Sequence, residues 1–439
     1  MFIRFPNKLQ GRNHRNERNN RIHFTSKVKD TVIIPFHKFK TKILRLNFSC
    51  IEIINYFILL TIIFLFTVNL INIITIKKIS RYSRSLNSSN RCENQEYISV
   101  LIPARNEERI IGRCVESALN QNYNNFEVIV LDDNSTDNTS KILSEIRNNR
   151  LKIIKGKQIE DGWVGKNFAC KQLSEAAKGN YILFIDADTI LEKNALENSV
   201  KFIKSQNADL VSFFPRQITI SFWEKIIIPL LHFVVLTMLP LILVEKTKRT
   251  SLTMANGQFM LFRRTAYDKI GGHYSVKNRI VEDVWLGRKI KISGGKLIFA
   301  DGTDIAYCRM YKNLNEIFEG FSKNIFPGLS FSTAGIIFVI TFFFFLYIIP
   351  YIMLIYGIII NTGTLILTSI ISIILAITIR ITHSLKFKLP LHSAFFHIIS
   401  SISLIILSIN SYRIIKFGSG AVWKERKYPE TMIKQKIRE

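Results

Sequence analysis

The stretch "YISVLIPARNEERIIGRCVESALNQ", residues 97–121, decides the fold, because an apolar run ends in polar residues and a helical pattern follows at once. The run "YISVLIP" is apolar along most of its length, which is typical of a strand buried on both faces. Five apolar residues then recur at helical spacing: Ile110, Ile111, Cys114, Val115 and Ala118. A strand, a polar cluster and a helix are therefore expected in that order.

The same order recurs along the central part of the chain. The run "FEVIVLDDNSTD", residues 126–137, ends in Asp132 and Asp133, and Ser135 or Thr136 can cap the next helix. Further units begin with "LKIIKG", "YILFIDADTILEKNAL" and "ADLVSFFPRQ". Strands that alternate with helices predict an α/β fold, with a mostly parallel sheet and helices on both faces. Ligands bind such sheets outside the carboxyl ends of the strands, where these polar clusters lie.

Two aspartates follow the apolar run of residues 181–185 with one alanine between them. In an extended backbone, Asp186 and Asp188 point to the same side and can direct both carboxylates towards one Mg²⁺ or Mn²⁺ ion. A divalent ion there can neutralise a diphosphate leaving group. The alternative is a helix cap or a solvated pair, because this short pattern is common by chance. The position at the end of a fully apolar strand favours the metal site.

Two more clusters have both a structural and a functional interpretation. Asp132 and Asp133 can accept a hydrogen bond from a base or ribose, or form an Asx turn before a helix. In "GWVGKNFAC", residues 162–170, backbone N–H groups and Lys166 precede a helix, an arrangement that suits phosphate. The glycine spacing is not that of a Walker loop, so this motif alone is weak.

A carboxylate pair begins another helical pattern, "RIVEDVWLGRKIKISGG", at residues 279–295. Glu282 and Asp283 in the first turn can simply compensate the helix dipole. The functional alternative is a general base that takes a proton from an acceptor hydroxyl.

Apolar segments divide the chain into domains. Residues 55–76 carry no charge over a length that spans a bilayer, which predicts a transmembrane helix. Three further spans are expected within residues 334–410. The central domain, residues 95–325, contains one more apolar run at 226–244, which is expected to be interfacial or re-entrant because the motifs on its two sides must share one compartment.

Basic flanks give the expected orientation. Lys77, Lys78, Arg81 and Arg84 directly follow the first span and favour a multi-pass membrane protein whose central domain faces the cytoplasm. Residues 1–50 are also basic and are expected to be a disordered extension, although their charge opposes this orientation. Residues 411–439 form a basic tail, which three C-terminal spans would place outside.

The composition fits a membrane setting better than nucleic-acid binding. The 60 Lys and Arg against 33 Asp and Glu give a net charge of +27, which suits either nucleic acid or anionic lipid. A hydrophobic content of 48% with 33 Phe favours lipid. Residues 1–50 have few aromatics for base stacking and no nucleic-acid motif, so no nucleic-acid partner is expected. The five cysteines form no CxxC pair and are expected to be reduced thiols.

Six motifs in order across residues 97–310 resemble the family 2 glycosyltransferases of the GT-A fold: "VLIPARNEE", "VIVLDDNSTD", "GWVGKNFAC", "FIDADT", "NGQFMLFRRTAYDKIGG" and "VEDVWLGRKI". The elements "GWVGK", "CRMYKNLNEIFEGFSKN" and "VWKERKYP" are similar to the membrane-bound branch that includes hopanoid-associated and carotenoid (diaponeurosporenoate) glycosyltransferases. The ordered set is far more specific than any single motif. The resemblance covers over half of the chain.

The resemblance implies a nucleotide pocket at the end of the first strand. Four residues would line it: Pro103, Ala104, Arg105 and Glu107. Asp133, or its neighbour Asp132, would contact the uracil. Lys166 would approach the nucleotide or its diphosphate.

The resemblance also implies the reacting groups. Asp186 and Asp188 would bind Mg²⁺ or Mn²⁺, with Asp186 also facing the nucleotide, and Asp283, beside Glu282, would be the catalytic base. An acceptor that is itself a carboxylate would need no base, and Asp283 would then only position it. Residues 256–258 would lie near the acceptor.

The implied function is inverting, metal-dependent transfer of one sugar from a nucleotide sugar, expected to be a UDP-sugar, to a membrane lipid or isoprenoid acceptor. A processive polysaccharide synthase of the same fold is the nearest alternative, disfavoured because no Gln-x-x-Arg-Trp follows the "ED" pair. The other alternative is a non-enzymatic, basic, membrane-tethered binding protein that uses residues 1–50. Sugar transfer that survives deletion of residues 1–50 would exclude it.

Overall fold

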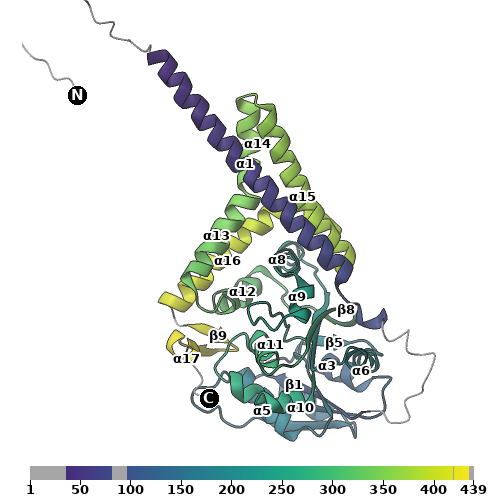
Figure 1. Cartoon of the computed structure of the whole chain (residues 1–439). Coiled ribbons are helices and arrows are strands. Elements are labelled where there is room, and N and C mark those ends of the chain that lie inside the picture. Colours follow the sequence, from purple (N-terminus) through teal and green to yellow (C-terminus); the bar gives the residue numbers. More distant parts are fainter. Residues whose placement is uncertain (1–35, 82–95, 419, 435–439) are drawn as a thin grey trace, which may run out of the picture. The chain divides into compact units, whose positions relative to one another are not determined.

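An eight-stranded sheet forms the centre of the molecule, with the strand order β3-β2-β1-β4-β7-β6-β8-β5. The computed structural model describes residues 36–81, 96–418 and 420–434 (Figure 1). Residues 52–439 form one compact unit, and the contacts reported below lie within it. The eight strands are β1 (Ile98–Ala104), β2 (Phe126–Asp132), β3 (Leu151–Lys155), β4 (Tyr181–Phe184), β5 (Thr189–Leu191), β6 (Leu210–Gln217), β7 (Met260–Arg263) and β8 (Leu297–Cys308).

The expected α/β fold with a mostly parallel sheet is confirmed. β1 runs parallel to β2 and β4, and β2–β3 and β6–β8 are also parallel. β7 is antiparallel to β4 and β6, and β5 is antiparallel to β8. Ala104 pairs with Asp132, and Leu101 pairs with Phe184, so the residues after β1, β2 and β4 emerge at the same edge.

Helices cover both faces of the sheet because successive strand residues point to opposite sides. Val100 and Ile102 pack with one buried cluster that includes α3, α4 and α6, whereas Leu101 packs with the cluster of α5, α10 and α11. These helices are α3 (Ile111–Leu119), α4 (Thr139–Glu145), α5 (Gly165–Ala176), α6 (Ala195–Ser205), α10 (Arg264–Lys269) and α11 (Glu282–Ile292). The 3-10 helix η1 (Gly272–Val276) joins α10 to α11.

The apolar run at 226–244 is broken into short helices around prolines. These are α7 (Phe222–Ile227), α8 (Leu230–Met238), which starts after Pro229, and α9 (Leu241–Lys246), which starts after Pro240. None of them is long enough to be a candidate membrane span within the described residues. Their interfacial position stays a prediction.

Four helical segments of the described chain are long and apolar enough to cross a membrane: Cys50–Thr75, Thr333–Ile359, Gly363–Phe387 and Leu391–Phe417. They contain α1 (Phe36–Thr75), α13 (Thr333–Tyr347), α14 (Ile349–Ile359), α15 (Gly363–Phe387), η2 (Leu391–Phe396) and α16 (His397–Phe417). In Figure 1, α14 runs beside α15, and α13 runs beside α16. Another helix, α12 (Leu314–Gly328), lies between β8 and α13 in the chain and packs against α16.

The two ends of the chain differ from the sequence-based expectation. Helix α1 runs from Phe36 to Thr75, and it is continuous because no proline or glycine interrupts this stretch. Residues 36–50, assigned to the N-terminal extension, are therefore helical, and residues 1–35 lie outside the described part. At the other end, the expected basic tail is folded as far as residue 434 into β9 (Ala421–Trp423), β10 (Arg426–Tyr428) and α17 (Glu430–Lys434).

The C-terminal segment folds because its apolar side chains find partners in the central domain. Tyr428 and Ile433 are buried in one small cluster with Val164, directly before α5. The sequence-based interpretation described this segment as a basic tail and noted "VWKERKYP" as similar to a known branch, but it did not place the segment against the central domain. We call the antiparallel pair β9–β10 the C-terminal hairpin.

Candidate active site

The site is built where the carboxyl ends of three neighbouring strands meet the starts of two helices. Arg105 and Glu107 follow β1, Asp133 follows β2, and Asp186 and Asp188 follow β4. Lys166 lies in the first turn of α5, and Glu282 and Asp283 begin α11. The predicted polar clusters are therefore brought together at one edge of the sheet.

Lys166 joins two of these clusters. Its ammonium Nζ lies 2.7 Å from Oδ1 of Asp186 and 2.8 Å from Oε1 of Glu282. Burial by itself lowers the pKa of Lys166, but the charges of Asp186 and Glu282 raise it well above its usual value, so the group stays cationic. Gly257 keeps this position open, because a Cβ atom there would lie 3.0 Å from the Nζ atom.

Asp186 and Asp188 form a carboxylate pair that fits a divalent cation. Burial, and then the charges of Asp186 and Glu107, raise the pKa of Asp188 to about 7, while Cys308 donates a hydrogen bond to it. Like charges held together in this way are relieved when a cation binds between them. Among the described residues, no group of three or more His, Cys, Asp or Glu side chains is arranged for a metal. Mg²⁺ is often bound by one or two carboxylates with substrate phosphates and water, and this pair fits that pattern.

Asp283 has the environment of a general base. Burial, and then the charge of Glu282, raise its pKa to about 7. Its Oδ2 atom accepts a hydrogen bond from the backbone N–H of Gly257 at 2.9 Å, and Oδ1 accepts one from the N–H of Val284 at 2.7 Å. A carboxylate whose pKa lies near neutrality can both take and hold a proton at working pH.

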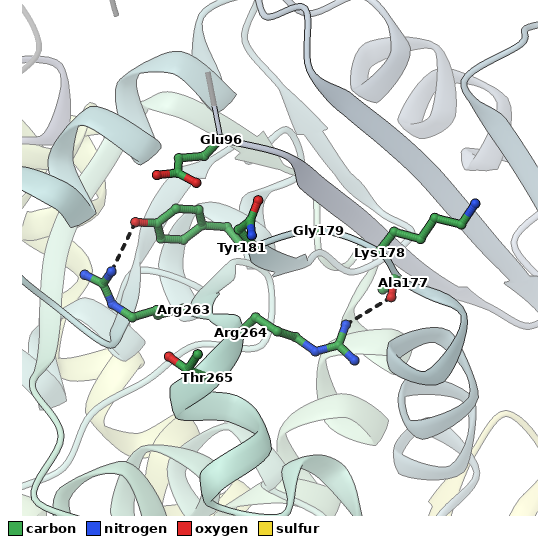
Figure 2. Close-up of a pocket in the computed structure, with 9 residues that line it drawn as sticks. Glu96, Ala177, Lys178, Gly179, Tyr181, Arg263, Arg264 and Thr265 are labelled. Atoms are coloured by element: carbon green, nitrogen blue, oxygen red, sulfur yellow. Dashed lines mark hydrogen bonds between the residues drawn. The ribbon is translucent and has the colours of Figure 1, made fainter. Parts of the chain in front are cut away.

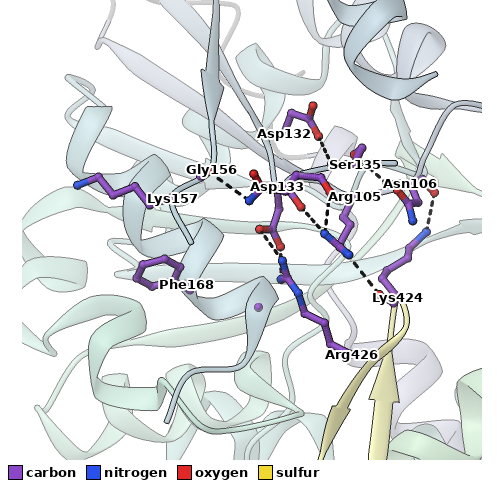
Figure 3. Close-up of polar contacts among 12 residues, drawn as sticks. Arg105, Asn106, Asp132, Asp133, Ser135, Gly156, Lys157, Phe168, Lys424 and Arg426 are labelled. Carbon is purple, nitrogen blue, oxygen red and sulfur yellow. Dashed lines mark hydrogen bonds and ion pairs between the residues drawn. The ribbon is translucent and has the colours of Figure 1, made fainter. Parts of the chain in front are cut away.

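Two interpretations were open for Asp132 and Asp133, an Asx turn before a helix and a hydrogen bond to a base or ribose. The contacts of the two side chains differ accordingly. Asp132 accepts hydrogen bonds from the backbone N–H of Ser135 and the hydroxyl of Ser140, so it organises the loop before α4. Asp133 instead receives the guanidinium group of Arg426 on both carboxylate oxygens (Figure 3). Asp133 is the member of the pair that faces the candidate site.

Of the four residues assigned to the nucleotide pocket, two lie in β1 and the other two, Arg105 and Glu107, follow it. Pro103 and Ala104 lie inside β1, and the side chain of Ala104 is buried in the core, so Ala104 can offer the site only its backbone. Arg105 donates to the carbonyl oxygens of Asp133 at 2.7 Å and Asn134 at 2.9 Å. Its guanidinium thereby fixes the loop after β2 against the end of β1.

His273 has a structural role. Its Nδ1 atom is 2.7 Å from the hydroxyl of Tyr267, and its ring packs edge-on against Phe184 at 4.6 Å between centroids. Burial, and then the charge of Lys166, lower its pKa to about 3. It is a neutral core residue between α10 and β4.

Three cations beside the site were missed by sequence reasoning. Lys424 and Arg426 come from the C-terminal hairpin and Lys323 comes from α12. "VWKERKYP" was noted only as similar to the family, and its distance along the chain gave no sign of where it packs. Figure 3 shows Lys424 and Arg426 reaching Asn106 and Asp133 from the hairpin.

A shallow hollow of about 490 Å³ lies at the opposite end of the strands and is not part of this site. Its lining comes from Glu96, residues 177–181 and residues 263–265 (Figure 2). Tyr181 is the first residue of β4, whereas the candidate site follows the last. Arg264 donates to the carbonyl oxygen of Ala177 at 3.0 Å, so one wall is closed by an internal hydrogen bond.

Comparison with known proteins identifies the central domain. Residues 99–271 match the sequence profile of Glycosyl transferase family 2, so this part of the chain is similar to the family 2 glycosyltransferases. A relative of known activity, 4,4'-diaponeurosporenoate glycosyltransferase of Staphylococcus aureus, is 30% identical over 241 residues. The match covers 54% of this chain and 62% of the relative, so the chain spans under two thirds of that protein's length.

Two solved structures show a weaker likeness. The mannosyltransferase PcManGT from Pyrobaculum calidifontis, in complex with GDP-Man and Mn²⁺, is 16% identical, with 82% of this chain and 96% of that chain covered and a TM-score of 0.44. S. aureus TarS 1-349, in complex with UDP-GlcNAc, is also 16% identical, with 73% and 92% covered and a TM-score of 0.35.

Proposed function

We propose that the chain transfers a single sugar, with inversion, from a nucleotide sugar, most simply a UDP-sugar, to a membrane lipid or isoprenoid acceptor in a metal-dependent reaction. The observation that carries this proposal is the cluster at the sheet edge. Lys166 links Asp186 of the carboxylate pair to Glu282, the neighbour of the buried Asp283. This one cluster has groups suited to the leaving diphosphate and a group suited to the attacking oxygen.

The residues divide the reaction between them. Asp133 and the end of β1 receive the nucleoside, and Lys166 meets the negative charge of the diphosphate. Asp283 accepts the proton of the acceptor hydroxyl as its oxygen attacks the anomeric carbon, and the carbon–oxygen bond to the diphosphate breaks. Mg²⁺ or Mn²⁺ held by Asp186 and Asp188 would supply stabilisation of the charge that develops on the departing nucleoside diphosphate.

The surroundings of the domain support a lipid acceptor. Four candidate membrane spans flank it, and a lipid-soluble acceptor resides in the bilayer that such spans would cross. The relative's name gives a glycosylated carotenoid as one example of such an acceptor. Lys77 and Lys78, directly after the first span, favour a cytoplasmic domain, where nucleotide sugars are made.

Contacts at the helix ends support a particular membrane topology. Asp304 of β8 pairs with Lys78 after α1 at 2.5 Å, and with Lys388 after α15 at 2.6 Å. The C-terminal ends of both helices therefore lie beside the domain. We infer that α1 enters the membrane from the far side and that α15 returns to the domain's side.

Helix α16 contacts domain-side elements near both of its ends. The hydroxyl of Ser400 donates to the carbonyl oxygen of Ile226 in α7 at 2.9 Å, and that of Ser411 accepts from the N–H of Phe326 in α12 at 2.9 Å. The hairpin that follows α16 touches Asp133. We therefore propose that α16 lies in the interface and that three segments cross, namely α1, α13 with α14, and α15. The sequence predicted three C-terminal spans, which would place the tail on the opposite side of the membrane from the domain. The arrangement proposed here has two C-terminal spans instead.

The transfer reaction is tested with purified full-length protein in detergent. The protein is incubated with a panel of nucleotide sugars, Mg²⁺ or Mn²⁺, and total membrane lipid. We expect transfer to lipid by the wild type, and a loss of at least about 100-fold in kcat for Asp188→Ala and for Asp283→Asn, because each variant removes a charge needed in the transition state.

The matched control is Asp268→Ala, which removes an exposed carboxylate whose partner is Arg264 in the same helix. Exposed pairs of this kind contribute little, so this variant should keep full activity. Unchanged turnover in Asp188→Ala or Asp283→Asn would contradict the assigned roles. Release of polymer rather than a singly glycosylated lipid would favour the processive alternative.

A further inference from the structure

The C-terminal hairpin covers the residues to which the proposed function assigns the nucleotide. Arg426 contacts both carboxylate oxygens of Asp133, with its Nη2 atom 3.1 Å from Oδ1. Lys424 Nζ lies 2.9 Å from Oε1 of Glu107 and donates to the carbonyl oxygen of Asn106 at 3.0 Å. The hairpin therefore spans the gap between the ends of β1 and β2 (Figure 3).

The same hairpin is fixed to the start of α5. The hydroxyl of Tyr428 accepts a hydrogen bond from the backbone N–H of Gly165 at 2.9 Å. A Cβ atom on Gly165 would lie 3.0 Å from both Trp423 and Tyr428, so only glycine lets the hairpin approach this closely. The hairpin is thus docked on the turn that holds Lys166, and it is not a loose tail.

Lys323 lies in α12, which packs against strand β9 of the hairpin. Burial is the main cause that lowers its pKa, followed by the charges of Lys166 and Lys424, and the carboxylates of Asp186 and Glu282 act in the opposite direction. No described carboxylate lies within ion-pair distance of its ammonium group. A half-buried lysine held near two other cations without a carboxylate partner is costly unless an anion binds there.

The sum of the charges at the site also favours a bound anion. Six carboxylates gather there, namely Glu107, Asp133, Asp186, Asp188, Glu282 and Asp283. Among the described contacts of the central domain, Arg105 and Lys166 are the cations that oppose them. Until a divalent cation binds, a site with this negative excess repels a nucleoside diphosphate, which is itself an anion. Most of this negative charge is offset by three cations, Lys323, Lys424 and Arg426.

We propose that Lys323, Lys424 and Arg426 form a cationic cover that binds the diphosphate of the donor, so that the donor site is completed by residues outside the family 2 domain. In the absence of donor, Arg426 and Lys424 pair with Asp133 and Glu107. When donor binds, the cover provides N–H donors to phosphate oxygens, the geometry for which guanidinium and ammonium groups are suited. This inference rests on the proposed use of a nucleotide sugar.

The test is titration calorimetry of UDP, GDP and uridine, each with Mg²⁺, on the full-length protein in detergent. We expect Lys323→Met and Arg426→Gln each to weaken nucleoside diphosphate binding by about tenfold or more, the usual size of a lost hydrogen bond to a charged group. Uridine, which lacks the diphosphate, should bind the variants as it binds the wild type. Lys323→Arg should restore most of the affinity.

The matched control is Lys427→Gln, which removes the same charge from an exposed position of the same hairpin and should leave binding unchanged. Equal loss of UDP and uridine binding would mean that the cations only hold the fold, and unchanged UDP binding in both variants would also overturn the inference. If UDP binding is unchanged but binding to phosphatidylglycerol vesicles falls, the anion is a lipid headgroup, and the inference is again overturned. A wild type that binds neither nucleoside diphosphate and transfers no sugar would overturn the proposed function itself.

Discussion

At the scale of single residues, the site depends on carboxylates whose environment holds their pKa values near neutrality. Asp188 and Asp283 both have pKa values of about 7, and in each case burial is the largest cause. The second cause is a neighbouring carboxylate, Asp186 for one and Glu282 for the other. The same physical arrangement thus prepares one side chain for a metal and another for a proton.

These pKa values predict how activity depends on pH. Asp283 must be deprotonated to act as a base, and a raised pKa means that it becomes protonated as the pH falls through about 7. At saturating Mg²⁺, where Asp188 stays deprotonated, we expect kcat/KM to fall about tenfold per pH unit below that value. The profile is measured between pH 5.5 and 8.5.

The Mg²⁺ concentration distinguishes the contribution of Asp188 to the pH profile from the contribution of Asp283. A cation competes with the proton on Asp188, so raising Mg²⁺ should move the part of the acid limb that belongs to Asp188 to lower pH. The part that belongs to Asp283 should not move, and it should be absent in Asp283→Asn. An acid limb that disappears entirely at saturating Mg²⁺ would argue against Asp283 as the base.

At the scale of single elements, the sequence predicts what is local. The apolar runs of β1, β2 and β4 can be read directly, because a strand buried on both faces is apolar along most of its length, and each run ends at its polar cluster. The choice between Asp132 and Asp133 could not be read from the sequence, because it depends on which carboxylate accepts from the backbone N–H of Ser135 and the hydroxyl of Ser140. The spacing of nearby residues also cannot predict the contact between Arg426 and Asp133, because the two residues are 293 positions apart.

Strand β8 joins the domain to the membrane helices through Asp304. Although burial raises its pKa, hydrogen bonds and charge from Lys388 and Lys78 lower it to about 2. A lowered folded-state pKa stabilises the fold above the unfolded value near 4, and this stabilisation is lost as the pH falls towards 2. The contribution is therefore fully present, and constant, between pH 5 and 8.

We expect Asp304→Asn to lower the free energy of unfolding by about 1 to 2 kcal/mol at pH 7, because it removes a partly exposed carboxylate shared by two lysines. The measurement is the thermal unfolding midpoint of the purified protein in detergent at several pH values from 5 to 8. Asp268→Asn, at an exposed pair, should change the midpoint little. A difference from wild type that shrinks between pH 8 and pH 5 would contradict the assignment.

At the scale of the whole molecule, the proposed topology has an odd number of crossings, so the two chain ends lie on opposite sides of the membrane. The prediction is tested with a membrane-impermeant maleimide on intact cells. Cys50 is exposed, whereas Cys114, Cys170 and Cys308 are buried, and Cys92, which lies outside the described residues, is replaced by serine for this purpose.

We expect Cys50 to react in intact cells. A cysteine introduced by Lys427→Cys in the C-terminal hairpin should react only after the cells are permeabilised. Labelling of both positions in intact cells would mean that α16 crosses the membrane and that the tail lies opposite the domain. That result would also separate the hairpin from Asp133.

The docking of the C-terminal hairpin has a consequence for how the protein is made. Residues 421–428 follow α13 to α16 in the chain, so the ribosome makes these helices before it makes the hairpin that contacts Asp133. A chain truncated before the hairpin lacks two of the cations that we propose for the donor site. If that proposal holds, sugar transfer begins only after the membrane helices and the hairpin have all been made, which couples activity to synthesis of the chain as far as residue 428.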